Sequence, residues 1–314
     1  MPPSPPSDIA PPVGTPRDMG GGIRAILAPN PSPMTHWGTN TYLLGRRRLA
    51  VIDPGPDDPA HLAAILAALG PGQSISHILV THAHLDHTPL ARQLAYETGA
   101  PVLAQGDARA GRSAVMARLA ETAEIGGGEG VDSAFVPDRN LADGEIVEGD
   151  GWRITAHRTP GHFGNHMCFQ TGAEMFSGDL VMGWASTLIS PPDGDLAQFR
   201  ASCERIRAAA PARLLPGHGA PVTDPAARID WLLAHRDARE RAILDALARG
   251  PADAATLARR IYTDTPAALM PAATRNVLAH LIDLAERGRA TPLDPLTPAT
   301  RFVRKRADPA RQGG

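Results

Sequence analysis

The sequence predicts a layered α/β domain at residues 19–222, followed by a smaller helical domain at residues 223–296. Up to Val222, short apolar runs typical of strands alternate with helix-forming stretches, which predicts sheets covered by helices. Beyond this residue the strand-like runs disappear and three helical stretches follow. With 314 residues, of which 43% are hydrophobic and 20% charged, the chain is large enough to form both cores.

Five strands and three helices are expected in the first half of the α/β domain. The strands are predicted at residues 23–28, 39–44, 49–52, 77–81 and 102–104. Asp58 followed by Pro59 is typical of a helix start and predicts a helix that ends at Gly70. The other helices are expected at residues 90–98 and within 107–130. Gly126–Gly128 are expected to form a flexible surface loop.

The second half of the domain is expected to be mostly β-structure. Strands are predicted at residues 145–147, 152–157, 166–170, 174–176 and 213–215. Thr171-Gly172 fits a tight hairpin turn between two of these strands. One helix is expected at residues 199–209, before the last strand.

The C-terminal region has the order of a winged-helix unit. Helices are predicted at residues 225–249, 254–262 and 271–287, with a short strand or wing at 289–292. A helical cap that packs on the α/β domain is the alternative interpretation. Residues 1–18 are rich in proline and are expected to be disordered, and residues 297–314 to form a basic tail.

Composition excludes several classes of protein. The chain has no run of about 18 apolar residues, so a membrane helix is not expected. The first residues resemble neither a secretory signal nor a transit peptide, which makes the cytoplasm the expected location. The two cysteines, Cys168 and Cys203, are too few for a disulfide framework and are expected to stay unpaired. The net charge of −2 argues against a protein that coats nucleic acid.

The segment THAHLDH, at residues 81–87, carries the strongest functional signal. It places His82, His84, Asp86 and His87 directly after an apolar strand. On an extended chain residues 82 and 84 point to the same side, and a turn can bring the other two side chains close by. Imidazole nitrogens and carboxylates are the ligands that zinc accepts. One four-coordinate ion cannot use all four of these ligands together with those from later segments, so two adjacent metal ions are predicted.

Three later segments each offer one more potential ligand at the end of a predicted strand. They are Pro160-Gly161-His162, Ser177-Gly178-Asp179 and Pro216-Gly217-His218. In each, glycine or proline beside the ligand permits a sharp bend of the chain. The sequence therefore predicts a metal centre built from His82, His84, Asp86, His87, His162, Asp179 and His218.

The order of these segments resembles the metallo-β-lactamase-fold hydrolase superfamily, whose HxHxDH motif matches residues 82–87. The resemblance covers residues 20–222 and implies an αββα sandwich with a di-metal centre along one edge of its two sheets. It implies that one metal is held by His82, His84 and His162, and the second by Asp86, His87 and His218. Asp179 would bridge the two, and Asp53 would support the site from an early turn.

Two departures from the family pattern bear on chemistry. Thr88-Pro89 stand where many members have Gly-Gly, which reshapes the turn after the motif. Asp179 stands where the true β-lactamases commonly have cysteine. A carboxylate is a harder ligand than a thiolate, so manganese or iron is an alternative to zinc. The same departure makes β-lactams poor candidate substrates.

A di-metal centre predicts hydrolysis without a serine or cysteine nucleophile. Two metals about 3.5–4 Å apart can share a water and lower its pKa toward 7. One metal would also polarise the oxygen under attack. Asp86 is the expected catalytic residue, because it could orient the hydroxide as well as bind metal. Further residues are weaker candidates. One, His166, could support the metal ligands from behind, and the rim of the pocket could include His36, Trp184 and the loop at residues 190–194.

Three functions follow from these observations. The C-terminal region and residues 30–43 resemble the β-lactamase-like-protein-2 branch, which includes an endoribonuclease, so cleavage of single-stranded RNA is the first. The second is hydrolysis of a thioester or ester, as in hydroxyacylglutathione hydrolases, which share the ligand set. The third is a winged-helix regulator that binds nucleic acid and retains an incidental metal site. A winged-helix regulator needs a basic recognition helix. The predicted helix at residues 271–287 contains two arginines and two acidic residues, so it is not basic.

Overall fold

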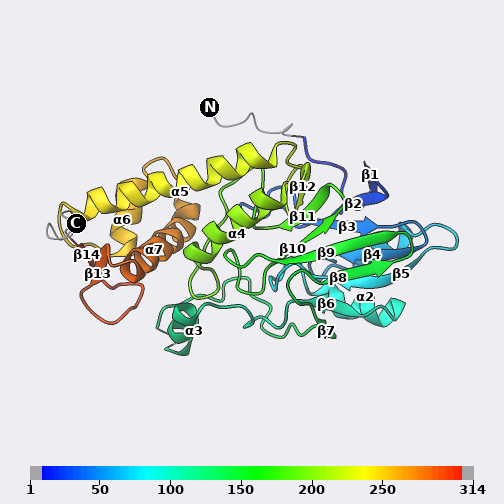
Figure 1. Cartoon of the computed structure of the whole chain (residues 1–314), viewed down its shortest axis with the longest axis horizontal. Helices are drawn as coiled ribbons and strands as arrows, with labels where there is room; N and C mark the ends of the chain where they lie inside the picture. The colour runs from blue at the N-terminus through cyan, green and yellow to red at the C-terminus, as the bar shows by residue number, and fades with distance from the viewer. Residues whose placement is uncertain (1–8, 123, 306–314) are drawn as a thin grey trace.

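The protein is a four-layered sandwich with a helical domain at one end. The computed structural model describes residues 9–122 and 124–305. Two sheets face each other with helices on their outer sides, and the C-terminal helices gather beside them (Figure 1). This αββα arrangement with its C-terminal winged-helix domain confirms the predicted fold class. Among the described residues, no helix is long and apolar enough to cross a lipid bilayer.

The larger sheet has seven strands in the order β1-β2-β3-β4-β5-β6-β7. Their bounds are Arg17–Gly20, Ile23–Leu27, Asn40–Leu44, Arg48–Ile52, Ser74–Leu79, Val102–Ala104 and Arg139–Asn140. Strands β1 to β4 are antiparallel, whereas β4 to β7 run parallel. The loops after the parallel strands therefore emerge at one edge of the sheet, a common place for ligand sites.

The smaller sheet has five strands in the order β12-β11-β10-β9-β8. Their bounds, from β8 to β12, are Ile146–Gly149, Trp152–Arg158, Met167–Thr171, Glu174–Gly178 and Arg213–Pro216. The hairpin between β10 and β11 pairs Thr171 with Glu174, as the Thr171-Gly172 turn predicts. The parallel pair β11 and β12 brings the carboxyl ends of both strands to the same edge.

The helices begin and end at the residues whose chemistry marks their boundaries. Their bounds from α1 to α7 are Pro59–Ala67, Leu90–Thr98, Ala114–Glu121, Leu196–Ala209, Pro225–Leu247, Ala254–Ile261 and Met270–Glu286. The side chain of Asp58 accepts a 2.8 Å hydrogen bond from the backbone N–H of His61, which caps α1. Helix α2 ends at Gly99, whose φ of 70° favours glycine because it has no Cβ.

Each interface between layers has its own apolar core. Ile52, Phe169 and Phe176 are buried between the two sheets. Helices α1 and α2 cover the larger sheet around buried residues such as Ile65 and Leu94. Helices α4 and α5 cover the smaller sheet. This burial on both faces explains why the strands read as nearly continuous apolar runs.

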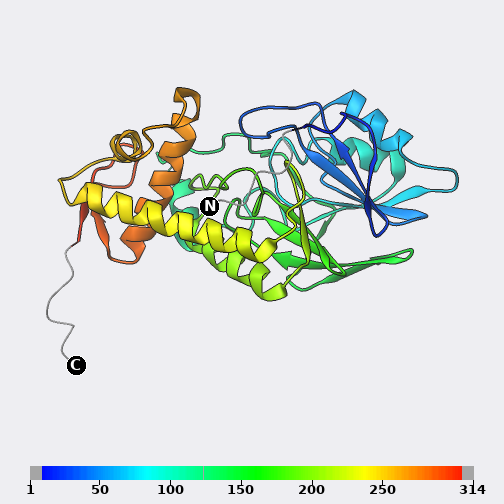
Figure 2. The same cartoon turned by 90° about the horizontal axis from the view of Figure 1, so that it is seen from above.

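Helix α5 joins the two domains. Ile229 and Leu232, in its first half, pack in the core under α4. Ile243 and Leu247, in its second half, pack with α6 and α7 in the core of the C-terminal domain. Figure 2 shows this helix running from the sandwich into the C-terminal domain. The domain boundary predicted near residue 223 thus falls just before a helix that contributes to both cores.

Several segments differ from the sequence-based expectations. Strand β1 begins at Arg17, inside the segment expected to be disordered, and pairs with β2. Strand β14, Phe302–Arg304, lies in the expected basic tail but pairs with β13, Ala290–Pro292, to complete the wing. Both segments are too short or too polar for their sequence to indicate a strand, and they become strands because they pair with a neighbour. Residues 1–8 and 306–314, the outer parts of the expected disordered segment and tail, lie outside the described residues.

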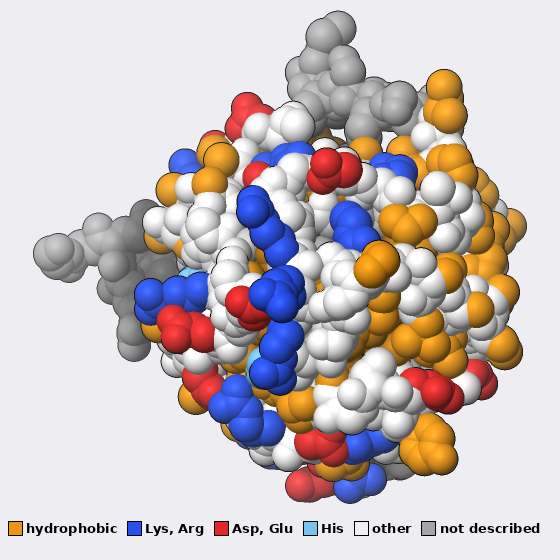
Figure 3. Space-filling view, turned by 90° about the vertical axis from the view of Figure 1, so that its right-hand side faces the viewer, with side chains coloured by type: hydrophobic (Ala, Val, Ile, Leu, Met, Phe, Trp, Pro, Cys, Tyr) orange, Lys and Arg blue, Asp and Glu red, His pale blue; other side chains and the backbone are white. Residues whose placement is uncertain are grey.

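Basic side chains gather at the end of the sandwich remote from the C-terminal domain. Figure 3 shows arginine side chains on this end of the molecule. Arg46 and Arg47, in the turn between β3 and β4, and Arg48, the first residue of β4, are exposed. The first residue of β3, Asn40, lies at the opposite edge, where its N–H bonds the carbonyl of Gly217. The exposed arginines are therefore separated from that edge by the length of the strands.

Candidate metal centre

The seven predicted ligand residues converge at one edge of the two sheets. Four follow β5, at positions 82, 84, 86 and 87, and the others follow β9, β11 and β12. Bonds between the sheets hold this edge together. The side-chain amide of Asn40 donates to the carbonyls of Pro216 and Gly219, and the hydroxyl of Tyr42 donates to Pro216 at 2.8 Å.

The first group consists of three imidazoles whose nitrogens point at one another. Nε2 of His82 lies 2.9 Å from Nδ1 of His84, and Nε2 of His162 lies 3.2 Å from the same Nδ1. Their ligand atoms lie within 4.8 Å of one another, the spacing of a candidate metal site. Three imidazole nitrogens around one point are a ligand set typical of zinc.

The second group consists of Asp86, His87 and His218, whose ligand atoms also lie within 4.8 Å of one another. Oδ2 of Asp86 lies 3.0 Å from Nε2 of His218 and 3.5 Å from Nε2 of His87. Asp86 keeps 24% of its side chain exposed, whereas both histidines are buried. The carboxylate therefore faces the open side of this group.

Asp179 lies between the two groups. Its Oδ2 is 3.2 Å from Nε2 of His218 in the second group and 3.8 Å from Nε2 of His162 in the first. A Cβ on Gly217 would lie only 2.4 Å from Oδ1 of Asp179 and 2.7 Å from Cε1 of His87. Glycine at this position therefore leaves the room in which the ligand side chains meet.

The buried polar atoms of the centre fit a pair of cations. Nε2 of His87 and Oδ1 of Asp179 are buried without a hydrogen-bond partner. An unpaired buried carboxylate oxygen and imidazole nitrogen are costly, and metal coordination satisfies both. The donor set therefore fits two divalent ions, with His82, His84 and His162 able to hold one and Asp86, His87 and His218 the other.

The electrostatics of the two groups differ. Burial, reinforced by the imidazole of His162, lowers the pKa of His84 to about 3, so its lone pair is free. Burial also works to lower the pKa of His218, but the carboxylates of Asp179 and Asp86 outweigh it and raise the pKa to about 10. The two carboxylates thus stabilise positive charge in the second group, and a divalent ion would supply that charge.

Asp53 fixes the orientation of two ligands from behind. Its Oδ2 accepts a 2.9 Å hydrogen bond from Nδ1 of His87, and its Oδ1 accepts one from the N–H of Thr81 at 2.7 Å. The hydroxyl of Thr81 lies 2.8 Å from Oδ2 of Asp53 and 3.0 Å from Nδ1 of His82. Such contacts select the tautomer that leaves Nε2 free to bind metal.

Other ligands are oriented by backbone carbonyls and by His166. Nδ1 of His162 lies 2.8 Å from the carbonyl of Leu188, and Nδ1 of His218 lies 3.1 Å from that of Gly38. His166 accepts a hydrogen bond from the N–H of Asp179 at 3.2 Å. His166 thus lies behind the ligands, in the supporting role for which the sequence made it a candidate.

A two-armed cleft opens from the metal centre. One arm, of about 480 Å³, is lined by Asp86, Asp179 and His218 and reaches Trp184. The other, of about 360 Å³, is bounded by Ser190 and Asp193 and lies away from these three ligands. His84 and His162 line both arms, so the arms meet at the first ligand group.

The C-terminal domain forms one wall of this cleft, which the sequence does not indicate. Leu269, at the end of the 3₁₀ turn Ala267–Leu269, and Ala272, in the first turn of α7, line both arms. Met34, from the loop before β3, faces the cleft from the other side. These side chains carry no metal-binding signal, and only the packing of the two domains brings them to the site.

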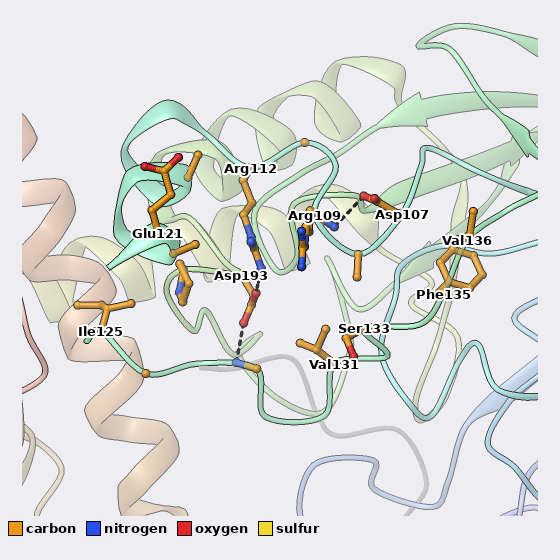
Figure 4. A pocket seen from close by; sticks show the side chains of 17 residues that line it. Asp107, Arg109, Arg112, Glu121, Ile125, Val131, Ser133, Phe135, Val136 and Asp193 are labelled. Carbon is orange, nitrogen blue, oxygen red and sulfur yellow. Dashed lines mark hydrogen bonds and ion pairs between the residues drawn. The ribbon is translucent and has the colours of Figure 1, made fainter. Parts of the chain in front are cut away.

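The glycine-rich segment after α3 is a loop in which Gly126 and Gly128 are exposed, as predicted, and it also borders the cleft. Asp193 accepts hydrogen bonds from Arg112 at 2.5 Å and from the backbone N–H of Gly128 at 2.8 Å, as Figure 4 shows. A Cβ on Gly127 would lie 2.5 Å from Pro192. This packing places Glu129 in the lining of both arms. A separate cavity of about 860 Å³, drawn in Figure 4, lies beside the segment.

Two weaker candidates lie at the rim. Trp184 lines the larger arm and stacks on the ring of His36, with their centroids 4.7 Å apart. In the loop at residues 190–194, Ser190 and Asp193 line the smaller arm. The cysteines are both free, as predicted, and both are buried.

The sandwich and its edge of histidines and aspartates define a metal-dependent hydrolase fold. The chain belongs to the metallo-beta-lactamase superfamily, whose family model matches residues 34–218. A beta-lactamase associated winged helix domain matches residues 254–294. Members of this superfamily are generally hydrolases that use divalent metal ions, which agrees with the donor set described above.

The similarity to named relatives extends over most of the chain. A beta-lactamase-like protein 2 homolog from Drosophila melanogaster is 32% identical over 273 residues, which cover 84% of this chain and 88% of the relative. A homolog of the same name from Caenorhabditis elegans is 29% identical, with 85% of each chain covered. Among solved structures, a beta-lactamase domain protein from Burkholderia ambifaria is 26% identical, with a TM-score of 0.78 and 95% of this chain and 96% of that chain covered.

Proposed function

We propose that the chain hydrolyses an ester or thioester with an apolar acyl group, using two divalent metal ions. The observation that carries this proposal is the lining of the cleft that opens from the candidate ligands. Met34, Leu188, Leu269 and Ala272 line both arms. Apolar walls around a few polar groups are typical of sites for small apolar ligands, and arms of about 360 and 480 Å³ have the usual size.

The charges of the cleft disfavour RNA, the other substrate class that the sequence suggests. Among the described residues that line the two arms, Arg275 is the one arginine or lysine. Its Nε donates to Ser190 at 2.9 Å, and its terminal nitrogens donate to the carbonyls of Ile125 and Pro191. It is therefore engaged by the protein, while Glu129 adds negative charge. RNA binding needs several available cations along its backbone.

The packing of the winged-helix domain disfavours the third function, a nucleic-acid regulator. Helix α7 occupies the position of a recognition helix, but only Pro271 and Glu286 are exposed along its length. A helix that reads a DNA groove must present an exposed face. The burial of α7 favours a packing role for the domain.

The side chains of the site have distinct roles in the proposed reaction. Two bound metal ions would lower the pKa of a water molecule and polarise the carbonyl oxygen under attack. The partly exposed carboxylate of Asp86 orients the attacking water and accepts its proton. Asp53, His166 and the carbonyls of Gly38 and Leu188 hold the ligand rings in place. The apolar walls exclude bulk water from the scissile bond.

Zinc is the metal that we propose first. Five of the seven candidate ligands are imidazoles, which zinc binds readily. Because Asp179 supplies a carboxylate and not a thiolate, manganese and iron are the alternatives. Activity after reconstitution of metal-free protein with each ion, matched to the metal content, would rank the three.

The substrate class is tested by a paired assay on one metal-loaded preparation. Acyl-thioesters and a labelled single-stranded RNA oligonucleotide are offered to the protein and to its His84→Ala variant. We expect thioester hydrolysis that is lost in the variant, and intact RNA. RNA cleavage that depends on His84, without thioester turnover, would overturn the proposal. RNA cleavage that persists in the variant would come from a contaminant.

A further inference from the structure

We propose that the C-terminal domain selects the acyl group, and that an apolar acyl chain longer than acetyl lies against Leu269 and Ala272. This inference rests on the proposed function and specifies its substrate class. It assigns a substrate-binding role to a winged-helix domain whose expected partner would be nucleic acid. Leu269 and Ala272 would be specificity-determining residues, since they line the cleft without being candidate metal ligands.

The smaller arm of the cleft is the place for the acyl chain. Its apolar side chains come from three separate segments: Met34 from the loop before β3, Leu188 from the loop after β11, and Leu269 and Ala272 from the C-terminal domain. The arm shares His84 and His162 with the larger arm, so a chain in it would end at the metal centre. A space of about 360 Å³ is much larger than an acetyl group needs.

The wall formed by the C-terminal domain is held rigidly against the catalytic domain. Oδ1 of Asn276, on α7, accepts hydrogen bonds from the N–H of Ile189 at 3.0 Å and from Arg236 at 3.2 Å. Arg236 is fully buried and also donates to the carbonyl of Thr187. Arg275, the residue before Asn276 on α7, adds its bonds to Ser190 and Pro191. Because these bonds fix the start of α7, Ala272 keeps its place beside the metal centre.

The charge around the arm also fits an uncharged chain. Arg275 and Asp193 line it, but each is paired within the protein, the latter with Arg112 and the N–H of Gly128. Glu129 is exposed at the border of both arms and would repel an anionic acyl group. A hydrocarbon chain gains free energy from burial there and leaves these pairs undisturbed.

Substitutions that change the size of the arm test this assignment. The metal-loaded protein is assayed with acyl-thioesters from acetyl to decanoyl. We expect kcat/KM to rise about fourfold per methylene until the arm is filled, the ratio expected for burying one CH₂ group. Ala272→Trp would fill the arm and lower kcat/KM for octanoyl at least about tenfold more than it lowers kcat/KM for acetyl. Leu269→Ala would enlarge the arm and shift the optimum to longer chains.

The matched control is Ala120→Trp, which places the same side chain in the separate cavity of Figure 4. It should keep the chain-length profile of the unmodified protein. An unchanged profile in both Ala272→Trp and Leu269→Ala would overturn the inference while leaving ester or thioester hydrolysis standing. If the unmodified protein hydrolyses acetyl and octanoyl substrates equally well, the inference is also wrong. Thermal unfolding of each variant verifies that its fold is intact.

A binding measurement separates the acyl subsite from catalysis. Metal-free protein is titrated with 1-octanol, and binding is followed by calorimetry. We expect saturable binding that weakens about tenfold or more in Ala272→Trp and is unchanged in Ala120→Trp. Octanol binding without turnover of any ester or thioester would contradict the proposed function but not the apolar subsite. Equal octanol binding by all three proteins would contradict the subsite itself.

Discussion

The carboxylate of Asp53 lies 2.9 Å from Nδ1 of His87, on the side of the ring that faces away from the candidate metal ligands. The same carboxylate accepts a hydrogen bond from the N–H of Thr81, the residue before the ligand motif. Asp53 has a φ of 51°, which places its side chain at a sharp turn after β4. One residue of the turn thereby sets the positions of ligands contributed by the next strand.

We therefore expect Asp53→Asn to weaken metal binding about 10- to 100-fold. Both carboxylate oxygens of Asp53 accept hydrogen bonds, so the NH₂ group of an asparagine would replace one acceptor and face a donor. Competition with a chelator of known affinity measures the change. Asp57→Asn, at an exposed position four residues later, is the control and should bind metal normally. Equal affinities in the two variants would remove the supporting role of Asp53.

Acid stability should depend on His61, which is buried in α1 beside the same turn. Nε2 of His61 lies 2.8 Å from the hydroxyl of Thr41. Burial, only partly opposed by Asp58, lowers the pKa of His61 from 6.5 to about 4. Between these values the unfolded chain binds a proton that the folded protein does not, so folding stability falls as the pH falls through this window.

His61→Gln should remove this part of the pH dependence, because glutamine can donate to Thr41 but does not titrate. Between pH 6.5 and 4, the free energy of unfolding of the metal-free variant should fall less than that of the metal-free unmodified protein. The difference between the two proteins should be at most on the order of 3 kcal/mol. Urea unfolding across this range measures the difference. Parallel stability curves for the two proteins would show that His61 takes up its proton in the folded state.

Cys168 and Cys203 should be unreactive in the native protein. Burial raises the pKa of each thiol to about 12, so both are protonated at neutral pH, and reagents cannot reach them. The thiolate is the reactive form of cysteine. Mass spectrometry after iodoacetamide treatment should find no labelling without denaturant and two labels in guanidinium chloride. Rapid labelling of native protein would contradict the burial of these residues.

The attachment of the C-terminal domain should depend on Arg236. Its guanidinium bonds Thr187 and Asn276, and it lies over the ring of Phe199 at 5.2 Å. Arg236→Leu removes the donor to the buried carbonyl of Thr187 and one of the two donors to Asn276, so it should lower the free energy of unfolding by about 1–3 kcal/mol. Arg241→Leu, at an exposed position of the same helix, should change it by less than about 0.5 kcal/mol. Denaturant unfolding that does not distinguish them would contradict this role.

The sequence predicts the candidate metal ligands better than the shape of the cleft beside them. His82 to His87 follow an apolar strand in one short segment, and the later ligands adjoin glycine or proline, so local patterns reveal them. Leu269 and Ala272 are ordinary apolar residues of a helical region, and their place in the cleft depends on how two domains pack. Local patterns contain no information about that packing.

Short strands at sheet edges were missed for a related reason. Strand β7 has two exposed residues, Arg139 and Asn140, and exists because it pairs with β6. The wing strand β14 is three residues long and gains its partner in β13. His61 carries no signal of its supporting place, because only the fold brings it to Thr41. In each case a distant partner, and not local propensity, decides the structure.

The central claim is that two metal ions bind between the seven converging side chains, and counting them tests it most directly. Chelator-treated protein is reconstituted with zinc, freed of excess metal, and its zinc content is determined by elemental analysis. We expect two ions per chain in the unmodified protein and one in His218→Ala, which loses a ligand of the second group only. Protein that retains no zinc, or a His218→Ala variant that still holds two ions, would contradict the claim.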